Sequence, residues 1–216
     1  MAFMKRTFVV AAAVLVVGLP AYADLLQNGS FEDGNFQPDN RQAMLLGVGA
    51  TDIAGWTVVN GGLSWDGIGN PYGLTASDGY RFLDLSGDHD NAPYAGVQQT
   101  VSTTIGAQYR LSFDIGTDPT YDPVAVSVSV TGVGSPPLFT STPTTPNRWE
   151  TFTFDFTAAS ANTTIALTGD VAGNASVAYI GLDNVSLNAI PEPGTLALIA
   201  GPGLLAFAAW RRLRKA

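Results

Sequence analysis

The sequence contains no cysteine and a single histidine, His89. Without thiols the chain can form no disulfide, zinc–thiolate site or cysteine nucleophile. With one imidazole, a Ser-His-Asp triad would have to be built on His89 alone. No nucleophile elbow, HExxH sequence or phosphate-binding glycine loop occurs, and Gly67-Ile68-Gly69 lacks the strand–helix context of a dinucleotide site. These absences favour a non-catalytic protein.

Basic residues are also scarce. Between Asp24 and Ala189 there is no lysine, and four arginines stand against seventeen acidic residues, which gives a formal net charge of −13. Such a surface repels the phosphates of nucleic acids and of anionic membranes, so we expect no nucleic-acid partner. It is compatible with calcium, with neutral or basic ligands, or simply with solubility outside the cell.

The N-terminal end reads as a secretory signal. Lys5 and Arg6 precede an apolar run over residues 8–19, Pro20 ends that run, and Ala21-Tyr22-Ala23 places small residues where signal peptidase reads them. The run is too short for a permanent membrane helix. We predict a signal peptide over residues 1–23 with cleavage before Asp24.

The C-terminal end has three parts. Pro191-Glu192-Pro193 comes first, an uncharged apolar stretch covers residues 195–210, and a basic cluster closes the chain: Arg211, Arg212, Arg214 and Lys215. The basic cluster predicts a cytoplasmic end. As a helix the stretch would span roughly 24 Å, less than the roughly 30 Å hydrocarbon core, and Gly201-Pro202-Gly203 weakens it. We therefore expect transient membrane insertion in preference to a permanent anchor.

This tail resembles the PEP-CTERM sorting signal of Gram-negative bacteria that make exopolysaccharide. The resemblance implies that residues 190–216 are the sorting signal and that an exosortase recognises Pro191, Glu192 and Pro193 and removes the tail at the inner membrane, with the cut either before or after this motif. The expected final location is the cell surface or the extracellular matrix.

The remaining chain, residues 24–189, reads as strands throughout. Residues 108–115, 124–131 and 151–156 alternate apolar and polar side chains with a period of two, as half-buried strands do. Further strands are expected at residues 55–59, 80–85, 96–101, 163–167 and 177–187, the last with a break near Gly181. Turn signals separate these segments, and no helical period is sustained. We predict one all-β domain, an antiparallel two-sheet β-sandwich or jelly roll.

Several segments of this domain resemble exported domains of the "choice-of-anchor" and DUF642 type. They read LLQNGSFEDG (25–34), AGWTVV (54–59), SDGYRFLDLSG (77–87), GVQQTV (96–101), YRLSFDIG (109–116) and YIGLDNVSL (179–187). The resemblance implies a galactose-binding-like jelly roll similar to several carbohydrate-binding modules. Fold analogy does not by itself assign a ligand.

The same resemblance implies a structural calcium ion shared by Glu32 and Asp183. Carboxylate and carbonyl oxygens are the ligands that Ca²⁺ prefers, and Asp33 is a weaker additional ligand. The alternative is that Glu32 lies on the surface and that Asp183 only orders a turn with Asn184. Both interpretations stay open at this point.

Aromatic residues next to polar ones suggest a ligand-binding face. We expect Trp65, Tyr72, Tyr80 and Tyr94 in or beside loops, where their rings could stack on sugars while Asp66 and Asp84 hold hydroxyl groups. Asp84 should lie on the sheet face opposite Leu83. The alternative is packing for the aromatic residues and pairing with Arg81 or Arg110 for Asp84. Trp56 and Trp149 are expected in the core, and residues 87–91 form either a solvated hairpin loop or a polar binding loop.

Three functions follow from these patterns. The preferred one is a carbohydrate-binding module that associates with extracellular polysaccharide. The second is a structural matrix protein that self-associates without a sugar site. A hydrolase that acts on matrix glycan is the least favoured, although the many carboxylates allow for paired acid catalysis.

Overall fold

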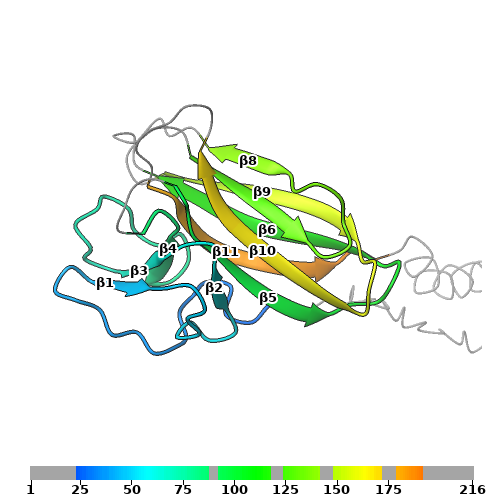
Figure 1. Cartoon of the computed structure of the whole chain (residues 1–216), viewed down its shortest axis with the longest axis horizontal. Helices are drawn as coiled ribbons and strands as arrows, with labels where there is room; N and C mark the ends of the chain where they lie inside the picture. The colour runs from blue at the N-terminus through cyan, green and yellow to red at the C-terminus, as the bar shows by residue number, and fades with distance from the viewer. Residues whose placement is uncertain (1–22, 88–91, 118–123, 142–147, 172–178, 192–216) are drawn as a thin grey trace, which may run out of the picture. The chain divides into compact units, whose positions relative to one another are not determined.

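The computed structural model describes residues 23–87, 92–117, 124–141, 148–171 and 179–191, and it divides the chain into two compact units. The unit Tyr22–Ile190 is the folded domain considered below. Its described part consists of two antiparallel sheets and contains no helix (Figure 1). The predicted all-β sandwich is therefore confirmed.

Eleven strands build these sheets. The six-stranded sheet has the order β1 (Ala43–Leu46), β3 (Leu63–Gly67), β4 (Arg81–Asp84), β11 (Gly181–Ala189), β6 (Gln108–Thr117) and β9 (Arg148–Thr157). The five-stranded sheet has the order β2 (Thr57–Val59), β5 (Gly96–Ser102), β10 (Asn162–Val171), β7 (Val124–Val130) and β8 (Leu138–Ser141). Strands β9 and β8 are the edges on one side of the sandwich.

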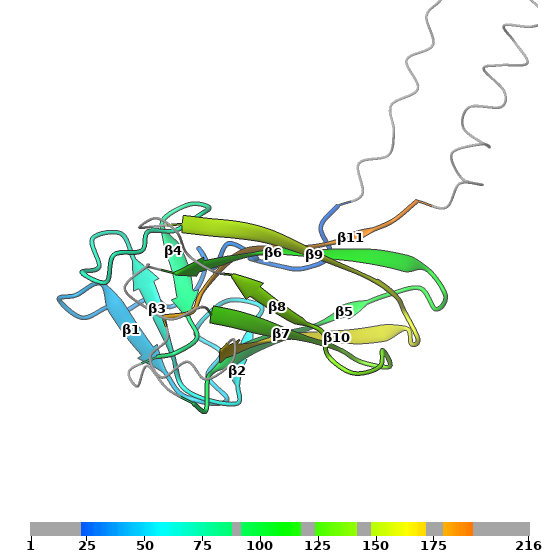
Figure 2. The same ribbon diagram turned by 90° about the horizontal axis from the view of Figure 1, so that it is seen from above.

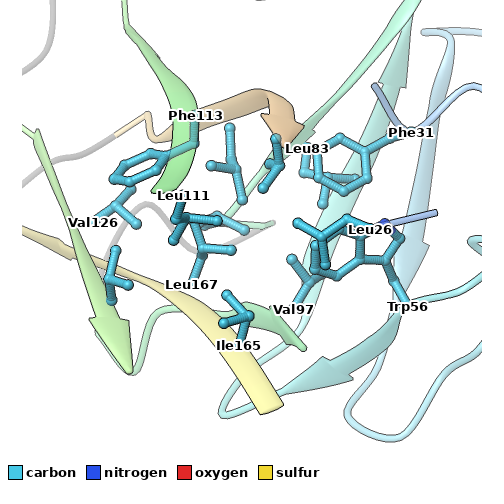
Figure 3. Close-up of a cluster of buried hydrophobic side chains, with 14 of the residues drawn as sticks. Leu26, Phe31, Trp56, Leu83, Val97, Leu111, Phe113, Val126, Ile165 and Leu167 are labelled. Atoms are coloured by element: carbon cyan, nitrogen blue, oxygen red, sulfur yellow. The ribbon is translucent and has the colours of Figure 1, made fainter. Parts of the chain in front are cut away.

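The alternation in the strands decides which side chains fill the space between the sheets. Leu111 and Phe113 of β6 face Val126 of β7, and Ile165 and Leu167 of β10 join them in one continuous cluster (Figure 3). A buried Val, Leu, Ile or Phe side chain contributes about 1.5–3 kcal/mol relative to exposure, so this cluster supplies most of the stability of a disulfide-free domain.

Most of the expected strands are confirmed, with shifts at their ends. Two strands, β1 and β3, were not predicted, and β8 falls in the proline- and threonine-rich stretch 135–146, which reads as a strand edge plus a loop. Strand β11 begins at Gly181, where a break was expected, and the structure has in addition a register shift between Asp183 and Ser186. The part of that prediction over residues 177 and 178, and the loop residues 88–91, lie outside the described residues.

Both ends of the folded domain lie at the same end of the sandwich. The carboxylate of Asp24 accepts hydrogen bonds from the backbone N–H of Leu26 (3.0 Å) and of Leu187 (2.8 Å). At the other terminus the N–H of Ile190 donates to the carbonyl of Gln108 (2.8 Å). Figure 2 shows the blue beginning and the orange end of the described chain side by side. Within the described ranges no helix has the length and hydropathy of a membrane span, and the predicted stretch 195–210 lies outside them.

Candidate functional site

The loop between β3 and β4, residues 68–80, lies over the outer face of the six-stranded sheet, and we call it the cover loop. A second, smaller hydrophobic cluster forms beneath it from Leu74, Phe82 and Tyr179, with Tyr72 and Trp149 packed against them. The indole N–H of Trp149 donates to the carbonyl of Thr75 (2.8 Å). Trp149 therefore holds the cover loop, and the expectation that it belongs to the main core is wrong.

Two glycines in the strands make room for this second cluster. A Cβ at Gly116 would lie 2.6 Å from the ring of Trp149, and a Cβ at Gly181 would lie 2.5 Å from a methyl group of Leu74. Any side chain at either position would therefore push the tryptophan or the cover loop away from the sheet.

Asp183 and Glu32 fasten the cover loop at its C-terminal end. Oδ2 of Asp183 accepts hydrogen bonds from the backbone N–H of Ser77 (2.8 Å) and of Asp78 (3.0 Å). Oε1 of Glu32 accepts hydrogen bonds from the N–H of Tyr80 (2.6 Å) and of Arg81 (2.7 Å). Two predicted calcium ligands, distant in sequence, thus hold consecutive parts of one segment, and we call this arrangement the carboxylate clasp.

The segment Asn28–Asp33 explains how Glu32 reaches the cover loop. Asn28 has a positive φ of 53°, its side chain accepts from the N–H of Asp33 (2.9 Å), and its carbonyl accepts from the indole of Trp56 (2.9 Å). At the other side a Cβ on Gly79 would lie 2.5 Å from Oε1 of Glu32, and Gly79 has a φ of 77°. The NGSFE and SDGYR motifs are therefore structural partners.

Asp114 is a member of this network that the sequence analysis missed. It lies directly opposite Asp183 in the pairing of β6 with β11. Its carboxylate accepts from the hydroxyl groups of Ser77 (2.9 Å) and Thr151 (2.6 Å) and from the side-chain amide of Asn184 (3.1 Å). The alternation of β6, which directs Asp114 away from the core, was the available signal.

Asp66 and Asp84 lie further along the same outer face, on β3 and β4. The hydroxyl groups of Ser64 and Tyr179 donate to Asp66, the latter at 3.0 Å. Asp84 accepts from the hydroxyl of Ser86 (2.6 Å) and from the N–H of Ile180 (3.2 Å). Asp84 does lie opposite Leu83, but only 3% of it is exposed and neither arginine pairs with it, so its expected place on an open sheet face is wrong.

Burial changes the protonation of these carboxyl groups. Desolvation raises the pKa of Asp183 to about 7, although the hydrogen bonds from backbone N–H groups favour the charged form and lower the pKa. Desolvation also raises the pKa of Asp84 well above its ordinary value, and that of Asp66 in the same direction. Near neutral pH the outer face therefore carries less charge than its composition suggests.

The calcium prediction can be compared with this arrangement. Ser77 and Asp78 share one oxygen of Asp183, and two backbone N–H groups share one oxygen of Glu32. In the part of the chain that the structure describes, no group of three acidic or histidine side chains could hold a metal ion. The geometry accounts for both carboxylates as hydrogen-bond acceptors, and calcium binding stays a prediction.

Two of the expected sugar-stacking aromatic residues are buried. Trp65 lies in β3, not in a loop, has no exposed surface, and donates from its indole to the carbonyl of Phe31 (3.0 Å). Tyr94 is 6% exposed and belongs to the main core. A ring without an exposed face cannot stack on a sugar, so the predicted placement of Trp65 and Tyr94 on a binding face is wrong. Asp66 is fully buried as well, so its predicted place on that face is also wrong.

Tyr80 is an expected sugar-stacking residue that is exposed in the structure. Its side chain is 67% exposed, and its carbonyl accepts a hydrogen bond from the N–H of Ile68 (3.1 Å), which is itself 55% exposed. Tyr72 is half-buried on the same loop. These two exposed residues are joined by a backbone hydrogen bond at the two ends of a loop that is anchored from beneath, so they offer a small apolar surface. We call Tyr80 and Ile68 the platform.

A shallow depression of about 400 Å³ lies elsewhere, beside β5. Its lining consists of Leu25, Gln27, Gly55, Gln99, Thr100, Val101 and Ser102. Gln99 and Gln27 exchange hydrogen bonds there, with the N–H of Gln27 donating to Oε1 of Gln99 (2.8 Å) and the amide of Gln99 donating to the carbonyl of Gln27 (3.0 Å). None of the sequence-predicted site residues contributes to it.

Comparison with known proteins gives a family and several similar folds. The family model described as "Protein of unknown function (DUF642)" matches residues 24–188, and the PEP-CTERM protein-sorting motif matches residues 189–215. Halomucin of Haloquadratum walsbyi is 27% identical over 195 residues, which is 86% of this chain and 2% of halomucin. The chain thus spans a very small part of that relative.

Solved structures with a similar fold include modules that bind carbohydrate. The CBM22-1–CBM22-2 tandem domain of Paenibacillus barcinonensis Xyn10C is 17% identical, with 80% of this chain and 47% of that chain covered and a TM-score of 0.49. TmCBM61 in complex with β-1,4-galactotriose is 18% identical, with 78% and 99% covered and a TM-score of 0.43. Such values do not assign a ligand to this chain. By its family match, the chain belongs to the DUF642 family and ends in a PEP-CTERM sorting motif.

Proposed function

We propose that this protein is a non-catalytic surface or matrix protein whose folded domain binds extracellular polysaccharide through the platform on the cover loop. The observation that carries the proposal is the exposed ring of Tyr80 on a loop that the carboxylate clasp and a second hydrophobic cluster hold in place. A fixed aromatic surface loses little conformational entropy when it stacks on a sugar ring. The family resemblance to carbohydrate-binding modules and the sorting motif agree with this role.

The placement of the carboxylates supports binding over hydrolysis. A glycosidase needs two carboxyl groups that flank an accessible glycosidic bond. Here Asp66, Asp84 and Asp183 are each at most 3% exposed and accept hydrogen bonds from the protein itself. None of the three is accessible to a substrate in the folded domain.

Affinity electrophoresis through gels that contain polysaccharide tests the proposal. We expect Tyr80→Ala to lose retardation, while Ile105→Ala, which changes an equally exposed residue on a different turn, keeps it. Because the sugar is unidentified, the gels would carry a neutral polysaccharide, an acidic one and the exopolysaccharide of the producing cell. Unchanged retardation of Tyr80→Ala would exclude the platform as the binding site. The depression beside β5 would then be the remaining candidate, and Gln99→Ala would test it.

The sorting motif supports a second part of the proposal. We infer that an exosortase recognises Pro191-Glu192-Pro193 in the sorting signal, residues 190–216, and removes the apolar tail, before or after this motif, once signal peptidase has removed residues 1–23, in a Gram-negative host. Intact mass measurement of the mature protein checks both cleavages. A Glu192→Ala chain that is shortened as efficiently as the wild type would contradict recognition of the motif.

Calcium is retained as a proposal that rests on the resemblance. A thermal melt with calcium and with EGTA tests it, because an ion that binds only the folded state raises Tm. The expected signature is a rise in Tm that is lost in both Glu32→Ala and Asp183→Ala. Equal melting in both buffers would leave hydrogen bonding as the whole role of the clasp.

One observation favours self-association as the second candidate function. Strand β9 is a ten-residue edge strand without lysine, proline or a register shift, and its Phe152 and Phe154 are only partly buried. Long edges of this kind pair with further strands unless charges prevent it. Analytical ultracentrifugation over a concentration series would show assembly in the wild type and its loss in Thr153→Lys. A monomer at all concentrations would exclude this candidate.

A further inference from the structure

The end of the sandwich from which the chain continues towards the sorting motif differs in composition from the rest of the domain. Three turns meet there: residues 103–107, 131–137 and 158–161. The N–H of Gly106 donates to the carbonyl of Ala158 (2.8 Å), the N–H of Thr103 donates to that of Ala161 (2.9 Å), and a Cβ on Gly132 would lie 2.7 Å from Ala159. The turn between β5 and β6 lies beside the last residues of β11 (Figure 1). We call these three turns the exit end.

The exit end contains no charged residue, although the domain carries a net charge of −13. Two charged groups of the described residues near it are engaged within the domain, and Glu192 lies further along the chain, outside the described residues. Asp24 accepts two backbone N–H groups, and Asp155 forms a two-point ion pair with Arg110 at 2.7 Å for each contact. Strand β11 begins at Gly181, which pairs with Asp84, and ends at Ala189, which pairs with Tyr109. Asp183 of the clasp lies near the beginning of this strand, whereas the exit end lies beside its last residues. Nine residues of strand separate the two ends by roughly 26 Å.

An exposed aliphatic side chain projects from the exit end. Ile105, at the tip of the β5–β6 turn, is 66% exposed, and the turn has no charged neighbour in sequence between Ser102 and Tyr109. An isolated exposed isoleucine needs no explanation on its own. Its position matters because it precedes Gln108 by three residues, and the carbonyl of Gln108 accepts the last backbone hydrogen bond of the domain, from the N–H of Ile190.

The distance to the apolar tail is short. Only residues 191–194 separate Ile190 from the uncharged stretch 195–210, and four residues reach at most about 14 Å when fully extended. A chain with its tail inserted in a bilayer therefore keeps some surface of the domain within reach of the lipid headgroups. Anionic headgroups repel carboxylates within a Debye length of about 8–10 Å, so an uncharged surface is the one that can approach.

We propose that the exit end is the membrane-facing surface of this protein while the tail is still attached, and that Ile105 enters the interface of the phospholipid bilayer. The proposal rests on insertion of the tail and not on sugar binding. It places the platform on the side turned away from the membrane, where a polysaccharide is accessible before the tail is removed.

The lack of cysteine permits a direct test. The exported chain with its tail intact is purified as two single-cysteine variants, Ile105→Cys and Ile68→Cys, and each is labelled with an environment-sensitive fluorophore. These two isoleucines are matched, since both are mostly exposed and the second belongs to the platform. The labelled proteins are reconstituted in vesicles of phosphatidylethanolamine and phosphatidylglycerol that contain a headgroup nitroxide lipid.

We expect quenching at position 105 to be several-fold stronger than at position 68. Equal quenching at the two positions, or no quenching at position 105, would overturn the proposal. A failure of polysaccharide binding by the platform would leave this result unaffected, so the two proposals are tested separately.

Discussion

The two faces of the six-stranded sheet differ in chemistry although the same strands make both. The inner face of β6 carries Leu111 and Phe113 into the main core, and the outer face carries Asp114 beneath the cover loop. The opposite sheet shields the inner face from water, and the cover loop shields the part of the outer face around Asp114, whereas Arg110 and Asp155 further along that face stay exposed. The inner face gains stability from apolar burial, whereas the outer face is tolerated only because each buried carboxylate has hydrogen-bond donors.

This difference teaches that burial on the outer face depends on one segment. The cover loop is held by Asp183, Glu32 and the indole of Trp149, and it in turn excludes water from them. Loss of a core side chain should weaken the whole domain, whereas loss of a clasp residue should release the loop first.

The largest effect is expected on the inner face. Trp65→Ala removes a fully buried indole and its hydrogen bond to Phe31, and we expect the free energy of unfolding to fall by about 3–5 kcal/mol. Urea denaturation measures the change. Ile105→Ala is the control, with a change within about 0.5 kcal/mol. A loss below about 1 kcal/mol for Trp65→Ala would contradict the burial of that ring.

A smaller effect is expected in the clasp. Asp183→Ala removes the acceptor of two backbone hydrogen bonds, from Ser77 and Asp78, and each such bond contributes about 0.5–1.5 kcal/mol. Asp183→Asn keeps one acceptor oxygen and should cost less. Hydrogen exchange should accelerate at residues 77–81 in the alanine variant before it does so in the core strands. A uniform acceleration would show that the two faces unfold as one.

Stability should also depend on pH through the outer face. Because burial raises the pKa of Asp183 to about 7, the folded state holds a proton that the unfolded state releases near pH 4. The contribution of Asp183 is therefore complete below about pH 4 and is lost as the pH rises to about 7. Chemical denaturation at several pH values, with EGTA present, should show this decline, and Asp183→Asn should flatten it. If stability instead increased over this pH range, and did so equally in Asp183→Asn, the predicted pH dependence would be wrong.

The smallest effect on stability is expected at the platform. Tyr80→Ala changes an exposed side chain, and the backbone N–H that Glu32 holds remains, so Tm should stay close to that of the wild type. The same variant should lose polysaccharide binding. A marked drop in Tm would mean that Tyr80 supports the cover loop, and the platform would then lose its separate role.

Strand positions were predictable where the alternation is long and clean. Strands β6, β7 and β9 follow from runs such as Val124-Ala125-Val126, because a period of two leaves one face for the core. Strand β3 was missed since Leu63–Gly67 lies between glycine-rich turns, which made the whole stretch look like a loop. That error placed Trp65 in a loop and made a core residue look like a ligand-binding one.

Most residues of the candidate site could be predicted from the sequence, but their structural role could not. Glu32, Asp84 and Asp183 were singled out by residue type and motif; the structure places Asp84 and Asp183 on one sheet face and Glu32 at the C-terminal end of the cover loop. Asp114 was missed because an aspartate in an alternating strand is indistinguishable from a solvated one. Only the position of the cover loop distinguishes the two cases.

The sequence by itself determined the all-β class, the face of each long strand and the presence of a sorting motif, because these depend on local periodicity and on short linear patterns. The tertiary structure decided which polar residues are buried, since Asp183 and Glu32 meet the cover loop only after segments from opposite ends of the domain come together. It also decided that Tyr80 stays exposed while Trp65 does not. Both outcomes depend on which loop covers which face, and local sequence does not specify contacts between residues so far apart in the chain.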